Sequence, residues 1–98
     1  MDYQALLSEI ESRAAKAEAL GNTLKFDIGD GDVIFLDGSG DKNVVSSENK
    51  EADCTIKITK ENFGKLMDGS LNPMMAFMGG KVKVDGDLGV AMKLQSLV

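Results

Sequence analysis

The sequence lacks histidine and tryptophan, and it contains a single cysteine, Cys54, among its 98 residues. Without a histidine or a second cysteine, the chain has no partner for a zinc site, an internal disulfide bond or a Cys/His nucleophile. Cys54 alternates with Ile56 and Ile58, a pattern in which a free cysteine usually serves as a small buried hydrophobic residue. We therefore predict a non-enzymatic protein with no catalytic residue, no metal site and no cofactor, in a reducing, cytoplasmic compartment.

Long hydrophobic runs and an excess of positive charge are also missing. No segment approaches 18 consecutive apolar residues, and early acidic residues such as Asp2 and Glu9 are unlike a secretory signal or transit peptide. The formal net charge of −5 argues against nucleic-acid binding and disfavours tight electrostatic docking on an anionic membrane. Local basic patches are still expected, because Lys81, Lys83 and Lys93 lie close together in the sequence.

Two patterns resemble ligand sites but fail on their spacing. Residues 37–48 place acidic residues at the first, fifth and twelfth positions of a calcium loop, yet Lys42 replaces the glycine that the sixth position needs. The pairs Gly29-x-Gly31 and Gly38-x-Gly40 lack the third glycine and the following helix of a phosphate-binding loop. We interpret all of these segments as turns.

The length predicts a single domain over residues 1–98, with roughly 60–70% of the unfolded surface buried. In Asp2–Leu20, apolar residues recur at steps of three and four, so we predict an amphipathic helix with Asp2 as its N-cap and Gly21 at its end. Only one side of this helix is apolar. It must therefore cover another element.

Four strands are predicted next, and their short connections indicate antiparallel pairing. Val33–Leu36 is apolar at every position, as expected for a central strand that is buried on both faces. The other three show weaker or alternating patterns and are Thr23–Ile28, Lys42–Ser46 and Asp53–Ile58.

Helix signals dominate the C-terminal half. Thr59 is a suitable N-cap for a helix over Lys60–Asp68, which Gly69 ends. Asn72 and Pro73 begin a second short helix. A fifth strand is predicted at 81–84, and a turn follows at 85–86. Asp87 then caps a final helical segment over 88–98.

Methionine is unusually concentrated in this half, since five of the six methionines lie between Met67 and Met92. Long, unbranched thioether side chains repack easily around ligands of varied shape. They are also ordinary core residues in many proteins, and that alternative stays open here. However, the short helices of this half carry more apolar side chains than they need to pack against the rest of the protein, which favours a pocket for an apolar ligand.

Several strings in this half are similar to the sterol carrier protein 2 family. Over residues 52–97, in order and without gaps, they are Ala52-Asp53-Cys54-Thr55-Ile56, Phe63, Leu66-Met67, Gly69, Asn72-Pro73, Ala76-Phe77, Gly80-Lys81-Val82-Lys83-Val84, Gly86-Asp87 and Ala91-Met92-Lys93-Leu94-Gln95. The resemblance implies an α/β (α+β) fold in which helices cover a five-stranded, mostly antiparallel sheet, with a lipid tunnel between the layers. It also implies binding of fatty acids, fatty acyl-CoA, phospholipids or sterols, with transient membrane contact. The terminal Ser96-Leu97-Val98 departs from a Ser-Lys-Leu peroxisomal signal.

The candidate ligand-binding residues follow from the matched positions, from the methionines between them and from two strand phenylalanines. Gln95 is the polar residue placed to orient a headgroup. The full set is Phe26, Phe35, Phe63, Met67, Met74, Met75, Phe77, Met78, Met92, Leu94 and Gln95.

The leading hypothesis is non-catalytic lipid binding and transfer. The alternative is an accessory domain that holds a hydrophobic intermediate, such as an isoprenoid quinone precursor, for partner enzymes. An empty void of about 300 Å³ would cost roughly 7 kcal/mol, comparable with the stability of a small domain. We therefore expect the space to be filled by lipid, by water or by methionines that move inward.

Overall fold

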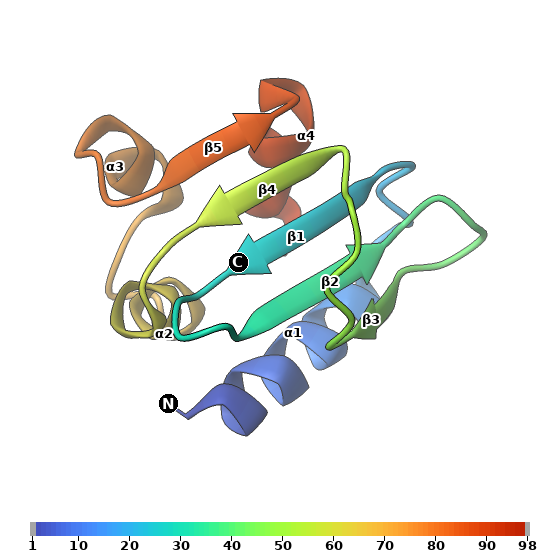
Figure 1. Ribbon diagram of the computed structural model, residues 1–98, viewed down its shortest axis with the longest axis horizontal. Coiled ribbons are helices and arrows are strands. Elements are labelled where there is room, and N and C mark those ends of the chain that lie inside the picture. The colour runs from blue at the N-terminus through green and yellow to red at the C-terminus, as the bar shows by residue number, and fades with distance from the viewer. Residues whose placement is uncertain (1, 98) are drawn as a thin grey trace.

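The computed structural model describes residues 2–97, and it has one five-stranded sheet with helices on one face (Figure 1). The strand order is β3-β2-β1-β4-β5, and every neighbouring pair is antiparallel except β1 and β4. This confirms the predicted α/β fold with a mostly antiparallel sheet. The elements are α1 (Tyr3–Lys16), β1 (Thr23–Asp27), β2 (Val33–Asp37), β3 (Val44–Ser46), β4 (Cys54–Lys57), α2 (Lys60–Asp68), α3 (Pro73–Met78), β5 (Lys83–Gly86), α4 (Leu88–Met92) and the 3-10 helix η1 (Lys93–Ser96).

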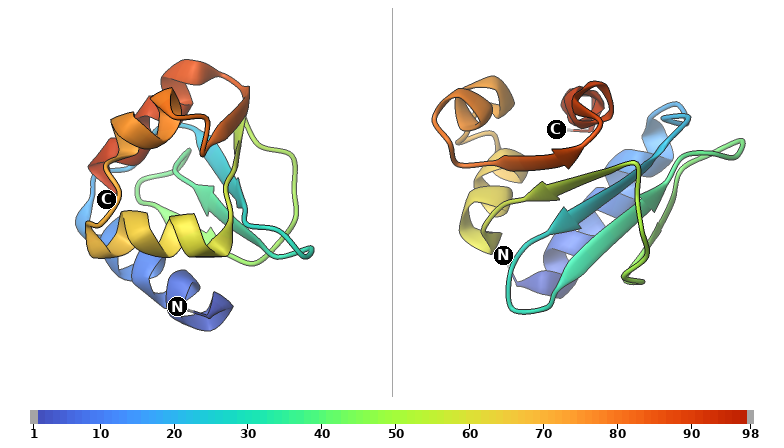
Figure 2. Two further views of the ribbon diagram at one scale, coloured as in Figure 1. Left: turned by 90° about the vertical axis from the view of Figure 1, so that its left-hand side faces the viewer. Right: turned by 45° about the horizontal axis from the view of Figure 1, so that its top comes forward.

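The face of the sheet that the helices cover, called the inner face, holds the core. Helix α1 buries Leu6, Ile10 and Ala14 against it, and the right view of Figure 2 shows α1 behind the sheet. The sheet contributes side chains that alternate along its strands and are fully buried. They are Leu24, Phe26, Ile34, Leu36, Cys54 and Ile56.

Helix α1 ends at Lys16, four residues before the predicted end at Leu20. The reason is the distant side chain of Asn43, whose amide nitrogen donates to the carbonyl oxygens of Ala14 (3.2 Å) and Glu18 (3.0 Å). Its amide oxygen accepts from the backbone N–H of Leu20 (3.0 Å). One side chain thus supplies the hydrogen bonds that another turn of helix would have supplied.

The parallel pairing of β1 with β4 corrects the prediction that all four early strands are antiparallel. Residues 47–53 form a crossover that carries the chain from β3 to the far side of β1, passing in front of β2 and β1 in Figure 1. Lys25 of β1 donates to Asn49 of this crossover at 2.9 Å. The crossover therefore covers the outer face, which explains why β2 is buried on both sides.

The C-terminal half follows the predicted helix signals closely. Helix α2 has Thr59 as its N-cap and ends at Gly69 with φ 84°, while the Asn72 side chain accepts from two N–H groups at the start of α3. Strand β5 covers Lys83–Gly86 rather than 81–84. The shift arises because the N–H of Lys81 still donates to the carbonyl of Ala76, which keeps the chain in the turn after α3.

Asp53 fixes the start of β4 beside β1. Its carboxylate accepts from the Thr23 N–H (3.1 Å) and the Asn22 side chain (3.4 Å), and these bonds hold the pKa of Asp53 below its usual value. A lowered folded pKa adds stability above the unfolded pKa, near 4, and this is lost as the pH falls through the folded value.

We expect Asp53→Asn to lower the melting temperature at pH 7 and the difference from the parent to shrink below about pH 4. Thermal unfolding between pH 3 and pH 7 measures it. Glu51→Gln, in the exposed crossover, is the control and should follow the parent curve. If the difference in melting temperature between Asp53→Asn and the parent stayed constant with pH, it would contradict a stabilising role for the ionised Asp53 carboxylate.

Candidate functional site

The predicted ligand-binding residues lie in three places, and the first is the contact between the sheet and the helices. Phe26 of β1, Phe63 of α2 and Leu94 of η1 have no exposed surface, and Met67 is 4% exposed. The rings of Phe26 and Phe63 have centroids 5.0 Å apart and a tilt of 41° between their planes. Together these four side chains form a continuous apolar layer, called the inner layer.

The inner layer is closely packed. A side chain that lined a space wide enough for water would keep some accessible surface, but Phe26, Phe63 and Leu94 keep none. At these positions the sheet and the helices touch directly. A lipid that reaches the inner layer must therefore displace side chains or move a helix.

The second place is the surface of α3 and α4. Met74, Met75, Met78, Leu88 and Met92 are 44%, 65%, 80%, 61% and 36% exposed, and we call this set the methionine surface. Of the three alternatives expected for the space, inward movement of the methionines does not occur for the four methionines of this surface, because phenylalanine and leucine already fill the interior. Within α3, the buried residue is Ala76, and Phe77 is partly buried against the core.

Met92 and Gln95 also line a hollow of about 590 Å³. Its other walls are Lys93 and the segment 17–20 that follows α1. The Gln95 amide nitrogen donates to the sulfur of Met74 at 3.0 Å, so α3 lies beside η1. Two of the predicted residues, Met92 and Gln95, therefore border an open hollow beside the C-terminal helices.

The third place is the outer face, where Phe35 is separated from the other candidates. Phe35 pairs with Lys25 in the β1–β2 register and is 5% exposed beneath the crossover. The ammonium nitrogen of Lys50 lies 5.8 Å from its ring centroid. Because it points away from the helices, Phe35 does not share a site with the other ten residues. Successive side chains of a strand point to opposite faces of the sheet, so Phe35 must face outward because its neighbours Ile34 and Leu36 face inward.

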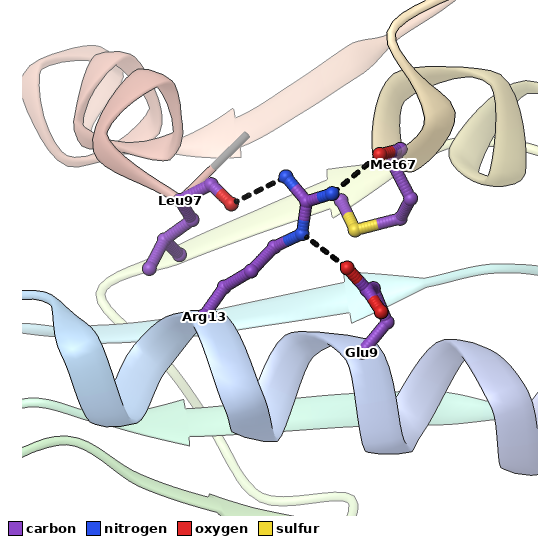
Figure 3. A network of polar contacts seen from close by, with 4 residues as sticks. All are labelled: Glu9, Arg13, Met67 and Leu97. Atoms are coloured by element: carbon purple, nitrogen blue, oxygen red, sulfur yellow. Dashed lines mark hydrogen bonds and ion pairs between the residues drawn. The ribbon is translucent and has the colours of Figure 1, made fainter.

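Arg13 is a residue of the site that sequence reasoning missed (Figure 3). Its guanidinium donates to the carboxylate of Glu9 (2.9 Å), the carbonyl of Leu97 (3.3 Å) and the carbonyl of Met67. The sequence predicts the pair with Glu9 from its i,i+4 spacing, but not the two distant carbonyls. Arg13 thus ties α1 to the end of α2 and to the residue that follows η1.

Comparison with known proteins decides the family. The model of the SCP-2 sterol transfer family matches residues 3–98. The chain belongs to this family. Human sterol carrier protein 2 is 46% identical over 59 residues, which cover 60% of this chain and 11% of that protein. The chain thus spans about a tenth of the length of the curated sterol carrier proteins that it matches.

Solved structures of the family have the same fold. The Aedes aegypti sterol carrier protein 2 in complex with palmitate has a TM-score of 0.71 and 20% identity, with both chains covered completely. The structure named UbiJ-SCP2 ubiquinone synthesis protein has a TM-score of 0.60 and 23% identity, over 95% of this chain and 76% of that one. Within residues 2–97 of our protein, no helix is both long and apolar enough to cross a bilayer.

Proposed function

We propose that this protein binds a long-chain lipid between the inner face of the sheet and helices α2 to α4. The observation that carries the proposal is that a member of the SCP-2 family combines a buried apolar inner layer with exposed methionines on helices α3 and α4. A fatty acid or fatty acyl-CoA fits best, because the interior offers apolar contacts and Gln95 places an amide at the edge. The palmitate in the Aedes aegypti relative supports this choice.

Helix α3 is the element most suited to move. It has six residues and contributes one buried side chain, Ala76, so few contacts hold it in place. Gly69 (φ 84°) and Gly80 (φ 72°) flank the segment, and glycine accepts large backbone changes because it has no Cβ atom. Flexible methionines on α3 can then turn inward and contact the ligand.

The expected affinity is modest. Burial of a 16-carbon chain gains roughly 12 kcal/mol at about 0.8 kcal/mol per methylene. Association and ordering oppose it by about 4–15 kcal/mol, and displacement of α3 adds to that cost. With the total cost at the low end of that range, the remaining gain of about 8 kcal/mol corresponds to micromolar binding that strengthens with chain length.

Titration with a fluorescent fatty acid tests this function, and we expect saturable binding that Phe77→Asp weakens about tenfold or more. The reason is that Phe77 contacts the core from α3, so a carboxylate there would be desolvated by the bound chain. Val44→Asp is the matched control, because Val44 is 60% exposed on the edge strand β3. Equal affinity for the parent and the Phe77 variant, or no binding of any lipid class, would contradict the proposal.

Transfer between membranes is a separate step from binding. We expect the protein to speed the movement of a fluorescent fatty acid from donor to acceptor vesicles in proportion to its concentration. A protein that binds the lipid without speeding its transfer would instead fit the accessory role, in which a hydrophobic intermediate is held for partner enzymes.

A further inference from the structure

A second hollow, of about 580 Å³, lies at the end of the sheet next to α3 and is rich in lysine. Ile28 and Ile58 form its apolar floor. Its charged residues are Lys57, Lys60, Lys81 and Lys83, with Asp27 and Asp30, and we call it the lysine groove. The left view of Figure 2 looks onto this end of the molecule, where α2, α3 and the start of β5 meet.

The lysines of this groove are poorly neutralised. Lys60 pairs with Asp32 at 2.5 Å, but within residues 2–97 no ion pair or hydrogen bond engages the ammonium groups of Lys57, Lys81 or Lys83. Asp27 is the neighbour of Lys57 in the parallel β1–β4 register, but its carboxylate accepts a hydrogen bond from the N–H of Gly29 and forms no ion pair with Lys57 among the described residues.

Lys57 and Lys83 also lie directly opposite each other in the β4–β5 pairing. Like charges at such positions destabilise a sheet. An anion bound between them would remove that repulsion, so the arrangement favours a negatively charged ligand.

The charge around α3 is opposite to that of the whole protein. Residues 69–84 contain Lys81 and Lys83 and no acidic residue, whereas the complete chain carries a net charge of −5. Met75 and Met78, both largely exposed, precede Lys81 by a few residues. Apolar side chains beside unpaired lysines are the combination that suits an anionic bilayer surface.

We propose that the lysine groove and the exposed methionines of α3 form a docking surface for anionic phospholipid bilayers. The lysines contact lipid phosphates, and Met75 and Met78 enter the layer between headgroups and acyl chains. The net charge of −5 is expected to oppose membrane binding, but the four lysines of the groove outnumber its two aspartates, and charges more than about 10 Å away are screened. Docking here would place α3, the helix proposed to move, against the bilayer.

Co-sedimentation with vesicles of phosphatidylcholine, with and without about one-third phosphatidylglycerol, tests the docking surface. We expect binding to the anionic vesicles that weakens as salt rises. Each lysine near an anionic bilayer contributes about fivefold to binding, so Lys81→Gln with Lys83→Gln should weaken binding about 25-fold. Lys16→Gln with Lys42→Gln removes the same charge from exposed positions elsewhere and should change binding less than about threefold.

Two further variants separate docking from folding. Met78→Ser should weaken binding several-fold without changing the melting temperature, because Met78 is 80% exposed. Lys83→Glu should raise the melting temperature by about 1–6 °C, since it turns a repulsive pair into an attractive one, and should still reduce binding. Equal losses for the two double-lysine variants, or equal binding to neutral vesicles, would overturn the proposal. Displacement from the vesicles by millimolar pyrophosphate would also overturn it, in favour of a small-anion site.

Discussion

Substitution of Phe63 by alanine is expected to lower the free energy of unfolding by about 3–5 kcal/mol. Phe63 has no exposed surface and packs its ring 5.0 Å from that of Phe26, at the centre of the inner layer. Its removal takes away the transfer free energy of the ring and leaves a cavity that the sheet and α2 close only in part. Denaturant unfolding measures the effect.

The same substitution tests whether the lipid binds by displacing side chains of the inner layer. Because the inner layer is filled, a ligand must displace side chains, and Phe63→Ala makes room in advance. We therefore expect a saturating fatty acid to raise the melting temperature of Phe63→Ala more than that of the parent. Phe63→Leu, which keeps most of the volume, should cost about 1–2 kcal/mol and respond like the parent. Identical ligand shifts for Phe63→Ala and the parent would show that the lipid binds elsewhere.

Substitution of Arg13 by methionine is expected to cost about 2–3 kcal/mol of stability. The guanidinium donates to the carbonyls of Met67 and Leu97, and hydrogen bonds to charged groups contribute about 1.5–3 kcal/mol each before solvent screening. The Arg13 side chain is 28% exposed, and solvent screening therefore reduces the combined contribution of these hydrogen bonds to stability. Methionine keeps the aliphatic part of the side chain, so the change reports the polar contacts.

Lys16→Met is the matched control for Arg13, since Lys16 is an exposed cation near the end of the same helix. It should alter the free energy of unfolding by less than about 0.5 kcal/mol. Hydrogen exchange should also show faster exchange in η1 for Arg13→Met, because its tie to α1 is lost. A loss of under 1 kcal/mol would show that Arg13 does not hold the C-terminal segment.

Local sequence signals predicted most of the C-terminal half. The caps Thr59, Asn72 and Asp87 act within three residues of themselves, so their partners could be identified without knowledge of the fold. The end of α1 was mispredicted because Asn43, far along the chain, supplies the hydrogen bonds there. The parallel β1–β4 pair was missed because short connections suggested hairpins, whereas 47–53 crosses the outer face.

The candidate site was predictable in composition but not in orientation. Sequence reasoning identified an apolar cluster, yet it could not assign Phe63 and Leu94 to the interior and Met75 and Met78 to the surface. Buried volume decides that division, and it depends on which side chains fit against the sheet. Arg13 was missed for a similar reason, since its carbonyl partners belong to distant segments.

Photo-crosslinking with a diazirine analogue of palmitate tests directly whether lipid enters the inner layer between the sheet and the helices. We expect saturable crosslinks, mapped by mass spectrometry, on peptides that contain Phe63 and Met67 or Met92 and Leu94, and excess palmitate should suppress all of them. Crosslinks confined to the outer face around Phe35 and Lys50, or crosslinks that excess palmitate leaves unchanged, would contradict it.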